Sequence, residues 1–514
     1  MESSSSSAKT VAAAPATMRP RPHVVLVSSP GAGHLIPMSE LARRLVAHHG
    51  LAATLVTFTD PSSSTTTLLA PLAAAGVATA TLPPVPLDDL PADARPETKV
   101  LALAARSVPH LRALLQDATS GGATRLAALV PDLFCAATLP LAAELGVPGY
   151  LFFPSNLAAL AVMRAAVELN DDDVPDGQEE LRRLPDPLDL PGGVRLRRED
   201  LPEGFRDGDP AVYAEYVGEG RRYRAAAGFL VNTFYEMEPA AAADFNDRAR
   251  AAGSSFPPAY PVGPFVRSAT VSSDDEPGGG EESKSIVIDW LDRQPTGSVV
   301  YVSFGSSGAL SVEQTAELAA GLESCGHRFL WVVRMPSLDV DGSQSSSTGK
   351  KKNDPLTWLP EGFLERTKGR GLAVAAWAPQ VRVLAHPATA AFVSHCGWNS
   401  TLESVSAGVP MIAWPLYAEQ RMNAVFLTEH VGVALRPRAR EEDGVVPREE
   451  VAAAVRELME GAEKGRAVRR QAGHMQQAAA RAWGPEGSSR RALEEVVGKL
   501  KAAAAAAVGG HVAS

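Results

Sequence analysis

The sequence predicts an α/β protein built from two facing Rossmann-like domains, each with a doubly wound parallel sheet, and with a cleft between them. Three observations support this fold class. The chain of 514 residues exceeds the usual size of a single hydrophobic core. Runs with the composition of buried strands alternate with amphipathic helices, which is the order of a parallel sheet. This strand–turn–helix order begins twice, first at residue 23 and again at residue 298.

The first copy starts with HVVLVSS at 23–29, which has the composition of a buried strand. A glycine-containing turn at 30–34 follows. Apolar residues on one helical face predict a helix over 37–49, with its proline in the first turn and Gly50 as its stop. LAATLVTF at 51–58 supplies the second strand, so this order predicts a parallel pair.

The same alternation continues through both halves of the chain. In the first half we expect strands at 126–130 and 150–153 around a helix at 136–145. In the second half the expected order is strand 298–306, helix 312–324, strand 329–333, strand 390–394 and helix 400–407.

Composition divides the chain into five segments. A Gly-, Ser- and acid-rich stretch marks a linker at 263–285, between an N-terminal domain at 22–262 and a C-terminal domain at 286–500. Residues 1–21 and 501–514 are expected to be disordered tails, and the last helix is expected to pack back on the N-terminal domain. The Ser-rich, acid-poor start also resembles a transit peptide, so a targeting role stays open.

Charge and cysteine content exclude several partner classes. The formal net charge is −10 and the basic residues are scattered, so nucleic acid is not expected as a partner. Three cysteines at unrelated spacings fit neither a disulfide framework nor a zinc site, which favours a reducing, cytoplasmic location. No apolar run approaches the ~20 residues that span a bilayer, so membrane insertion is not expected. We expect a monomer.

The most informative segment runs from Trp377 to Gln420 and reads WAPQVRVLAHPATAAFVSHCGWNSTLESVSAGVPMIAWPLYAEQ. A tight turn at 395–397 joins its expected strand to its expected helix. The free N–H groups and positive dipole end of that helix would face the opening of the turn, and such an arrangement binds phosphate. His395 and Asn399 lie at this opening and can donate hydrogen bonds to diphosphate oxygens.

Other residues of this segment have two interpretations. Ser400 is placed to donate to a phosphate and Glu403 to accept from ribose hydroxyls, but Ser400-x-x-Glu403 is also an ordinary capping box. Trp377 can stack on a uracil face and Gln380 can reach a ribose, whereas an isolated tryptophan at a strand end is more often part of a core. The residues alone leave these alternatives open.

Taken whole, the segment resembles the signature of the plant family 1 UDP-glycosyltransferases of the secondary-product type, through its W-A-P-Q opening, H-C-G-W-N-S centre and final Gln. The likeness covers nearly the whole chain and is strongest to the hydroquinone (arbutin synthase-like) and monolignol glucosyltransferases. It is carried by SPGAGHLIPMSELARRL, VPDLF, GFLVNTFYEMEP, YPVGP and WPLYAEQ. The resemblance implies the GT-B fold, with a UDP-sugar donor on the C-terminal domain and a small hydrophobic, hydroxylated acceptor on the N-terminal domain.

The resemblance also implies which residues contact the donor. The final Gln accompanies glucose more often than galactose, so UDP-glucose is the expected co-substrate, and no further cofactor is expected. The implied contacts are Trp377, Ala378 and Gln380 with the uridine, Glu403 with the ribose, Ser306, His395, Asn399 and Ser400 with the phosphates, and Trp398, Glu419 and Gln420 with the sugar, with Tyr417 beside them.

Inverting glycosyl transfer needs a base that takes the proton of the attacking hydroxyl. His34 lies just past the first strand, where open α/β sheets place their ligands. Its imidazole is largely neutral at cytosolic pH, and a carboxylate such as Asp132, just past the 126–130 strand, would steady the imidazolium. Without the resemblance, such loop residues are more often incidental or caps. In the resembling family these two positions form the catalytic pair.

The acceptor pocket is expected to be apolar, with Leu133, Phe134 and, by resemblance, Ser155 as contacts. No metal is expected. The acidic runs at 171–173 and 339–341 lie in polar loop stretches, where solvated turns explain them better than a metal site. Helix-end N–H groups can stabilise the leaving group instead.

The expected activity is therefore inverting, metal-independent O-glucosylation of small phenolic or other hydroxylated secondary metabolites by UDP-glucose. A nicotinamide-dependent oxidoreductase shares the architecture, but Ile36 replaces the third glycine of its G-x-G-x-x-G fingerprint. The remaining alternatives are a non-catalytic nucleotide-sugar binder, another UDP-sugar, or a nitrogen, sulfur or carbon acceptor.

Overall fold

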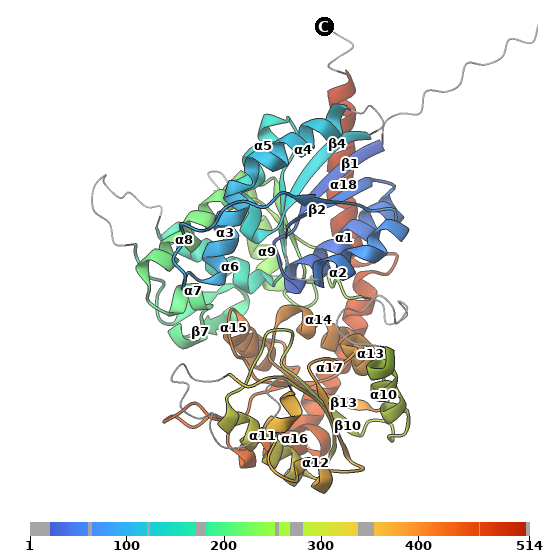
Figure 1. Ribbon diagram of the computed structural model, residues 1–514. Coiled ribbons are helices and arrows are strands. Elements are labelled where there is room, and N and C mark those ends of the chain that lie inside the picture. Colours follow the sequence, from blue (N-terminus) through green and yellow to red (C-terminus); the bar gives the residue numbers. More distant parts are fainter. Residues whose placement is uncertain are drawn as a thin grey trace, which may run out of the picture.

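Two α/β units stacked end to end make up the molecule, as the computed structural model shows (Figure 1). The N-terminal unit is coloured blue to green and the C-terminal unit yellow to red, and the last helix, α18 (Ser488–Gly509), runs back along the N-terminal unit. The expected tail up to residue 20 and the acidic runs at 171–173 and 339–341 lie outside the described residues. The structure describes residues 21–59, 64–120, 124–170, 181–251, 256–267, 281–337, 354–461 and 463–509.

The N-terminal unit is built on parallel strands in two adjoining sheets, of order β3-β2-β1-β4 and β5-β8-β9. Bridges from Leu129 to Gly149 and from Asp132 to Phe152 join them. A short antiparallel hairpin, β6 (Leu188–Leu190) with β7 (Val194–Leu196), lies apart from them. The parallel strands are β1 (Arg21–Val27), β2 (Ala52–Phe58), β3 (Ala78–Leu82), β4 (Thr124–Pro131), β5 (Tyr150–Phe153), β8 (Gly228–Val231) and β9 (Ala259–Pro261).

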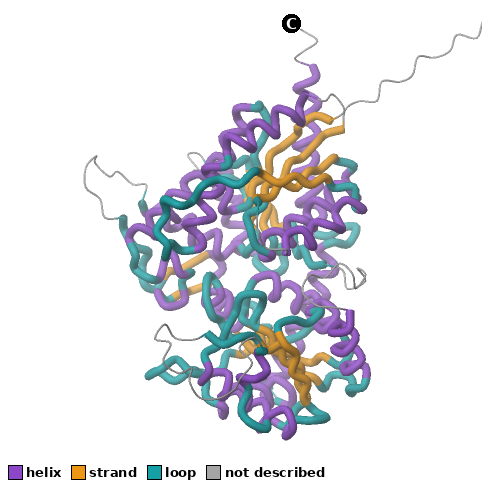
Figure 2. Tube along the Cα trace, in the orientation of Figure 1, coloured by secondary structure: helices purple, strands orange, loops and turns teal. Residues whose placement is uncertain are grey.

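The C-terminal unit has one six-stranded parallel sheet of order β12-β11-β10-β13-β14-β15. Helices enclose the sheets of both units (Figure 2), so their strands are rich in valine, leucine and other apolar residues, as strands covered on both faces must be. This arrangement confirms the predicted fold class. The strands are β10 (Val299–Ser303), β11 (Arg328–Val333), β12 (Gly371–Ala375), β13 (Thr389–Ser394), β14 (Met411–Ala413) and β15 (Ala434–Leu435).

The helices follow the strands in the alternating order of a doubly wound fold. Those of the N-terminal unit are α1 (Ala32–His49), α2 (Ser64–Ala74), α3 (Pro96–Arg106), α4 (Val108–Ser120), α5 (Leu139–Glu144), α6 (Leu157–Leu169), α7 (Glu203–Arg206), α8 (Pro210–Arg222) and α9 (Pro239–Arg250). Those that follow are α10 (Glu281–Asp292), α11 (Val312–Cys325), α12 (Phe363–Arg366), α13 (Gln380–Ala385), α14 (Trp398–Ala407), α15 (Gln420–Val425), α16 (Arg448–Glu460), α17 (Lys464–Ala482) and α18.

Each unit has one point where the strand order reverses direction. In the N-terminal unit the chain runs from β1 outward to β3, and the strands from β4 onward lie on the other side of β1. In the C-terminal unit the same reversal lies between β10 and β13. Ligands of doubly wound sheets bind at the carboxyl ends of the strands at such reversals. The loops that follow β1, β4, β10 and β13 are therefore the places to look for a site.

Helix α1 begins earlier than the sequence pattern predicts. It starts at Ala32, directly after Gly31 with φ of 100°, and not at Pro37. Glycine adopts this conformation without strain, so the chain turns from strand to helix at once. Pro37 lies inside the helix, and Gly50 ends it in the left-handed conformation, as expected. The early start places His34 in the first turn of α1.

The expected linker and C-terminal tail differ from the structure at their ends. Helix α10 begins at Glu281, inside the expected linker, and Phe265 at the other end of the linker is buried. Helix α18 continues through the alanine run to Gly509, because alanine has the highest helix propensity. Apolar residues of α18, such as Val496, share a hydrophobic core with Leu26 of β1. None of the described helices is long and apolar enough to cross a membrane.

The chain crosses between the units at two places that lie side by side. The rings of Phe265, before the first crossing, and Trp483, at the second, are 5.9 Å apart. The Arg44 guanidinium of α1 lies 3.7 Å from the Trp483 ring centroid and 5.4 Å from that of Phe265, and it pairs with Glu40 at 3.3 Å. Both crossings are thereby attached to the helix that carries His34.

We expect Arg44→Gln to destabilise this junction by about 1 kcal/mol, because the neutral amide loses the cation–π contact with Trp483. The measurement is the thermal unfolding midpoint. Arg250→Gln is the matched control, because Arg250 is 77% exposed and its recorded ion pair, among the residues that the structure describes, is with Asp247 within its own helix turn. Equal midpoints for the two variants would contradict the assigned role of Arg44.

Candidate active site

His34 and Asp132 meet at the strand-order reversal of the N-terminal unit. The imidazole Nδ1 of His34 lies 2.5 Å from Oδ2 of Asp132. His34 is in the first turn of α1 and Asp132 directly follows β4, so the ends of neighbouring parallel strands bring the two residues together. The Asp132 side chain is fully buried, whereas that of His34 is 23% exposed. The second nitrogen of the imidazole, Nε2, is therefore the one available to a ligand.

Asp132 is held in place from three directions. Its backbone N–H donates to Val27 O at 2.9 Å, and its Oδ1 accepts a hydrogen bond from Phe134 N at 3.0 Å. The buried hydroxyl of Ser29 also donates to Oδ1. Ser29 was not among the expected site residues, although its position at the end of the first expected strand could have indicated it. With Oδ1 occupied in this way, Oδ2 is left to orient the imidazole.

The charge of this pair sets the protonation of His34. Burial alone lowers the pKa of an imidazole, but here the carboxylates of Asp132 and Glu419 and the hydrogen bond to Asp132 outweigh burial, so the pKa of His34 is raised. A raised pKa makes the neutral imidazole a stronger proton acceptor. The pair therefore has the properties of a general base with its supporting carboxylate.

A loop next to this pair carries the expected acceptor contacts. The rings of Phe134 and His34 are 5.4 Å apart, and Leu133 and Phe134 are both half-buried. The carboxylate of Glu219 accepts a hydrogen bond from Ala136 N at 3.1 Å and so helps to hold this loop. Burial raises the pKa of Glu219 to about 7. Ser155 is buried, and a hydrogen bond from its side chain acts to lower the pKa of Glu419 on the other unit. These residues can form the apolar wall of an acceptor pocket.

The strand-order reversal of the C-terminal unit carries His395, directly after β13. The imidazole packs between two glycines so closely that a Cβ on Gly305 or Gly397 would lie 2.6 or 2.4 Å from Nε2. Burial lowers the pKa of His395 to about 4, so its ring is neutral near pH 7. Its Nδ1 has no partner within the described part of the chain. Ser306 follows Gly305 and is exposed beside it.

Helix α14 starts at this turn, and its first residues do not form the capping box that the sequence allowed. The cap is Gly397, without a side-chain hydrogen bond. Ser400 and Glu403 instead accept hydrogen bonds from Gln380 Nε2, at 2.8 and 2.7 Å. The helix begins two residues earlier than Ser400, so its N-terminal N–H groups open directly onto the turn. Gln380, Ser400 and Glu403 thus form one polar group.

Trp377 and Ala378 lie just before that group and differ in burial. Trp377 is half-buried in the loop after β12, and its backbone N–H donates to Ala375 O at 2.7 Å. Ala378 is buried at 6% exposure. The structure therefore leaves part of the Trp377 ring accessible beside Gln380, where a planar base could stack.

Two residues at the start of α14 reach across to the N-terminal unit. The indole N–H of Trp398 donates to Asn232 O at 2.7 Å, and the residue is buried. The expected contact of Trp398 with the sugar stays a prediction. Asn399 Nδ2 donates to Gly33 O at 3.0 Å, next to His34. Gly33 O is available because Pro37, four residues on in the helix, has no N–H to donate to it.

The loop after β14 holds Tyr417, Glu419 and Gln420. Gln420 is buried, and its Oε1 accepts from Leu416 N and Tyr417 N at 2.9 and 3.1 Å, so this oxygen orders the loop. Burial raises the pKa of Glu419, whereas a positive charge on His34 acts to lower it. The two side chains, one from each unit, are therefore close enough for their charges to interact. The loop thus brings a carboxylate of the C-terminal unit close enough to act on the charge of the candidate base.

Strained backbone marks the same loops. Ala376, Cys396 and Ala418 have φ values of 64°, 64° and 53°, and among the described residues they are the non-glycine residues with positive φ. Each directly precedes or follows a residue of the expected donor site. Such conformations cost of order 1–3 kcal/mol each and cluster at ligand sites.

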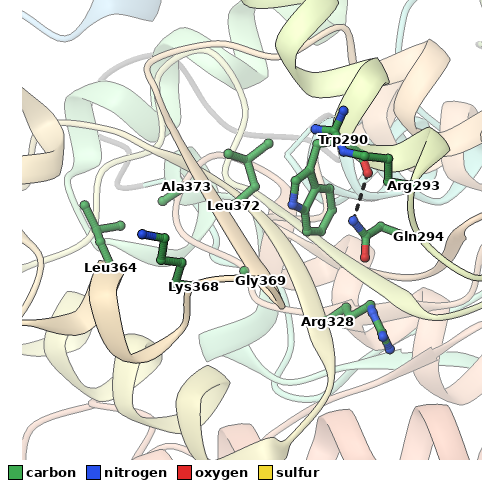
Figure 3. A pocket seen from close by; sticks show the side chains of 10 residues that line it. Trp290, Arg293, Gln294, Arg328, Leu364, Lys368, Gly369, Leu372 and Ala373 are labelled. Atoms are coloured by element: carbon green, nitrogen blue, oxygen red, sulfur yellow. Dashed lines mark hydrogen bonds between the residues drawn. The ribbon is translucent and has the colours of Figure 1, made fainter.

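Features elsewhere do not compete with this site. A cavity of about 610 Å³ lies on the outer side of the C-terminal unit, between α10, β12 and α12, and is lined by residues such as Trp290, Arg328 and Lys368 (Figure 3). None of the expected site residues lines it. Within the described ranges, no group of three or more His, Cys, Asp or Glu residues could hold a metal ion.

Comparison with known proteins agrees with the resemblance seen in the sequence. A sequence model of the family described as UDP-glucoronosyl and UDP-glucosyl transferase matches residues 287–470. UDP-glycosyltransferase 72B1 of Arabidopsis thaliana is 45% identical over 94% of this chain and 96% of its own length. The hydroquinone glucosyltransferase of Rauvolfia serpentina is 43% identical over 94% and 98%.

Solved structures agree as well. Phytolacca americana UGT2 complexed with UDP-2-fluoro-glucose and pterostilbene is 38% identical, covers 93% of this chain and 100% of its own, and superposes with a TM-score of 0.79. Because these relatives match nearly the full length of the sequence, this chain belongs to the UDP-glucuronosyl and UDP-glucosyl transferase family and is a UDP-glycosyltransferase with the GT-B fold.

Proposed function

We propose that this enzyme transfers glucose from UDP-glucose to a hydroxyl group of a small phenolic acceptor, with inversion at the anomeric carbon. The observation that carries the proposal is the His34–Asp132 pair, which faces a phosphate-binding type of helix start on the other unit. We assign acceptor binding to residues 22–262 and donor binding to residues 286–500. In this assignment Leu133, Phe134 and Ser155 contact the acceptor.

The proposed reaction uses both units. His34 Nε2 takes the proton of the acceptor hydroxyl while the acceptor oxygen bonds to the anomeric carbon. The bond between that carbon and the diphosphate oxygen breaks, and its electron pair leaves with UDP. Asp132 stabilises the imidazolium, and the N–H groups of α14 together with His395 stabilise the departing diphosphate.

Support for glucose comes from two sources. The relatives include a protein named as a hydroquinone glucosyltransferase and one solved with UDP-2-fluoro-glucose. In this chain, the carboxylate of Glu419 interacts electrostatically with His34, and Gln420 is the next residue in the same loop. We propose that Glu419 and the amide nitrogen of Gln420 bind the sugar and that Trp377 and Glu403 bind the nucleoside.

The test is an acceptor panel of simple phenols, including hydroquinone, offered with UDP-glucose, UDP-galactose and UDP-xylose. The expected result is a product heavier than the phenol by one hexose residue, formed fastest from UDP-glucose and formed equally well with a chelator present. Faster transfer from another UDP-sugar would overturn the choice of glucose. UDP binding without transfer to any acceptor would favour a non-catalytic binder.

A further inference from the structure

Two buried asparagines from different units form a hydrogen bond beside the proposed site. Asn156 Nδ2 donates to Asn423 Oδ1 at 2.7 Å, and neither side chain has any exposed surface. Asn156 lies directly before α6 in the N-terminal unit, and Asn423 lies in α15 of the C-terminal unit. If this hydrogen bond were broken, two buried amide groups would be left without partners, which costs free energy. The bond therefore favours the arrangement of the two units in which both asparagines are paired.

The orientation of both amides is fixed by their other partners. Asn156 Oδ1 caps α6 by accepting from Ala159 N at 2.7 Å, so its nitrogen must face Asn423. Asn423 Oδ1 accepts from that nitrogen, so its own Nδ2 must donate, and it does so to Cys396 O at 2.9 Å. A single series of hydrogen bonds therefore runs from the start of α6 to Cys396, with no freedom to reverse.

Cys396 is the centre of the turn at 395–397 that carries His395. Its φ of 64° is strained for a residue with a side chain, and the bond from Asn423 holds its carbonyl group. Asn423 Nδ2 also lies 3.4 Å from Glu419 Oε1. The asparagine pair thus connects the N-terminal unit to both loops that we assign to the diphosphate and the sugar.

We propose that Asn156 and Asn423 are positioning residues that fix the donor-binding turn relative to the unit that carries His34. The expected effects on kcat rest on the proposed function. Asn423 holds the turn within its own unit, whereas Asn156 sets the distance between the units. Misplacement of reacting groups by about 1 Å can cost about 10²-fold in rate, so the bond affects the chemical step more than donor affinity.

The decisive variant is Asn156→Ser, because serine still caps α6 but is too short to reach Asn423. We expect kcat to fall at least about tenfold while the Kd of UDP, measured by calorimetry, stays within about twofold. Asn156→Asp is the second variant, since it is isosteric and caps the helix but cannot donate to Asn423. It is expected to show the same division between kcat and Kd.

Asn170→Ser is the matched control. Asn170 lies at the other end of α6, is buried, and donates to Ala166 O and Arg182 O within the N-terminal unit. We expect this control to lose thermal stability and keep its kcat. If it loses kcat as much as Asn156→Ser does, the effect is general destabilisation and the inference is wrong. An unchanged kcat in folded Asn156→Ser enzyme would overturn it equally.

Asn423→Ser separates this inference from the proposed function. This variant loses the bond to Cys396 as well, so the Kd of UDP is expected to weaken at least about threefold, and no acceptor is needed to measure it. A wild-type protein that binds UDP but glucosylates nothing would refute the proposed function alone. An unchanged Kd in Asn423→Ser would refute the assigned control of the turn, whatever the activity.

Discussion

Replacing His34 with alanine is expected to lower kcat by about 10³-fold, within the range that a lost general base produces. The Kd of UDP should stay unchanged, because the imidazole lies on the N-terminal unit and, in the proposed mechanism, acts on the acceptor hydroxyl in the transition state. Single-turnover kinetics with UDP-glucose and a phenol, together with calorimetry of UDP, give the two numbers.

The control for this substitution is His110→Ala, because His110 is an exposed histidine of the same unit, on α4. It should retain wild-type turnover. A His34→Ala enzyme that keeps more than about a tenth of its kcat would show that another group takes the proton, and the roles of both His34 and Asp132 would have to be reassigned.

Asp132→Asn should have the second largest effect, a fall in kcat of about 10²-fold, because the amide cannot stabilise a positive imidazolium. It should also move the pH profile. The base must be neutral to accept a proton, so the rate rises with pH through the pKa of His34. Asp132 contributes to raising that pKa, so in Asp132→Asn the rise should occur at lower pH.

A pH series of kcat/KM for wild type and variant tests this shift. Ser29→Ala is an informative companion, because it removes one hydrogen bond to Asp132 and leaves the charge in place. It should lower kcat and shift the rise of the rate with pH by less than Asp132→Asn does. If the rate rose at the same pH in Asp132→Asn and in wild type, this rise would not reflect the titration of His34.

The meeting of His34 and Asp132 could be expected from the sequence because the family resemblance pointed to the two residues and the topology places them at one edge of a sheet. Each residue follows a strand of one parallel sheet, and carboxyl ends of neighbouring strands share an edge. The same reasoning located the turn at 395–397 after its strand. Their catalytic and binding roles stay predictions, since proximity does not measure turnover.

Features that depend on contacts between separate elements of the fold could not be predicted in this way. The hydrogen bond from the Trp398 indole to Asn232 O joins residues 166 positions apart, and no local pattern indicates it. The capping box that Ser400-x-x-Glu403 allowed does not form, because α14 begins at Trp398 and Gln380, from another helix, donates to both side chains. Neither Asn156 nor Asn423 has a local pattern that distinguishes it from any other polar residue near a helix end.

The hydrogen bond from Asn399 to Gly33 O depends on Pro37 more than on the side chain at position 33. The oxygen that Asn399 contacts belongs to the main chain of Gly33, so exchanging the side chain at position 33 would leave that acceptor atom in place. A lone pair of this oxygen stays free because Pro37, one helical turn further on, has no N–H to donate to it. This contact between the two units therefore depends on Pro37, a residue that takes no part in it.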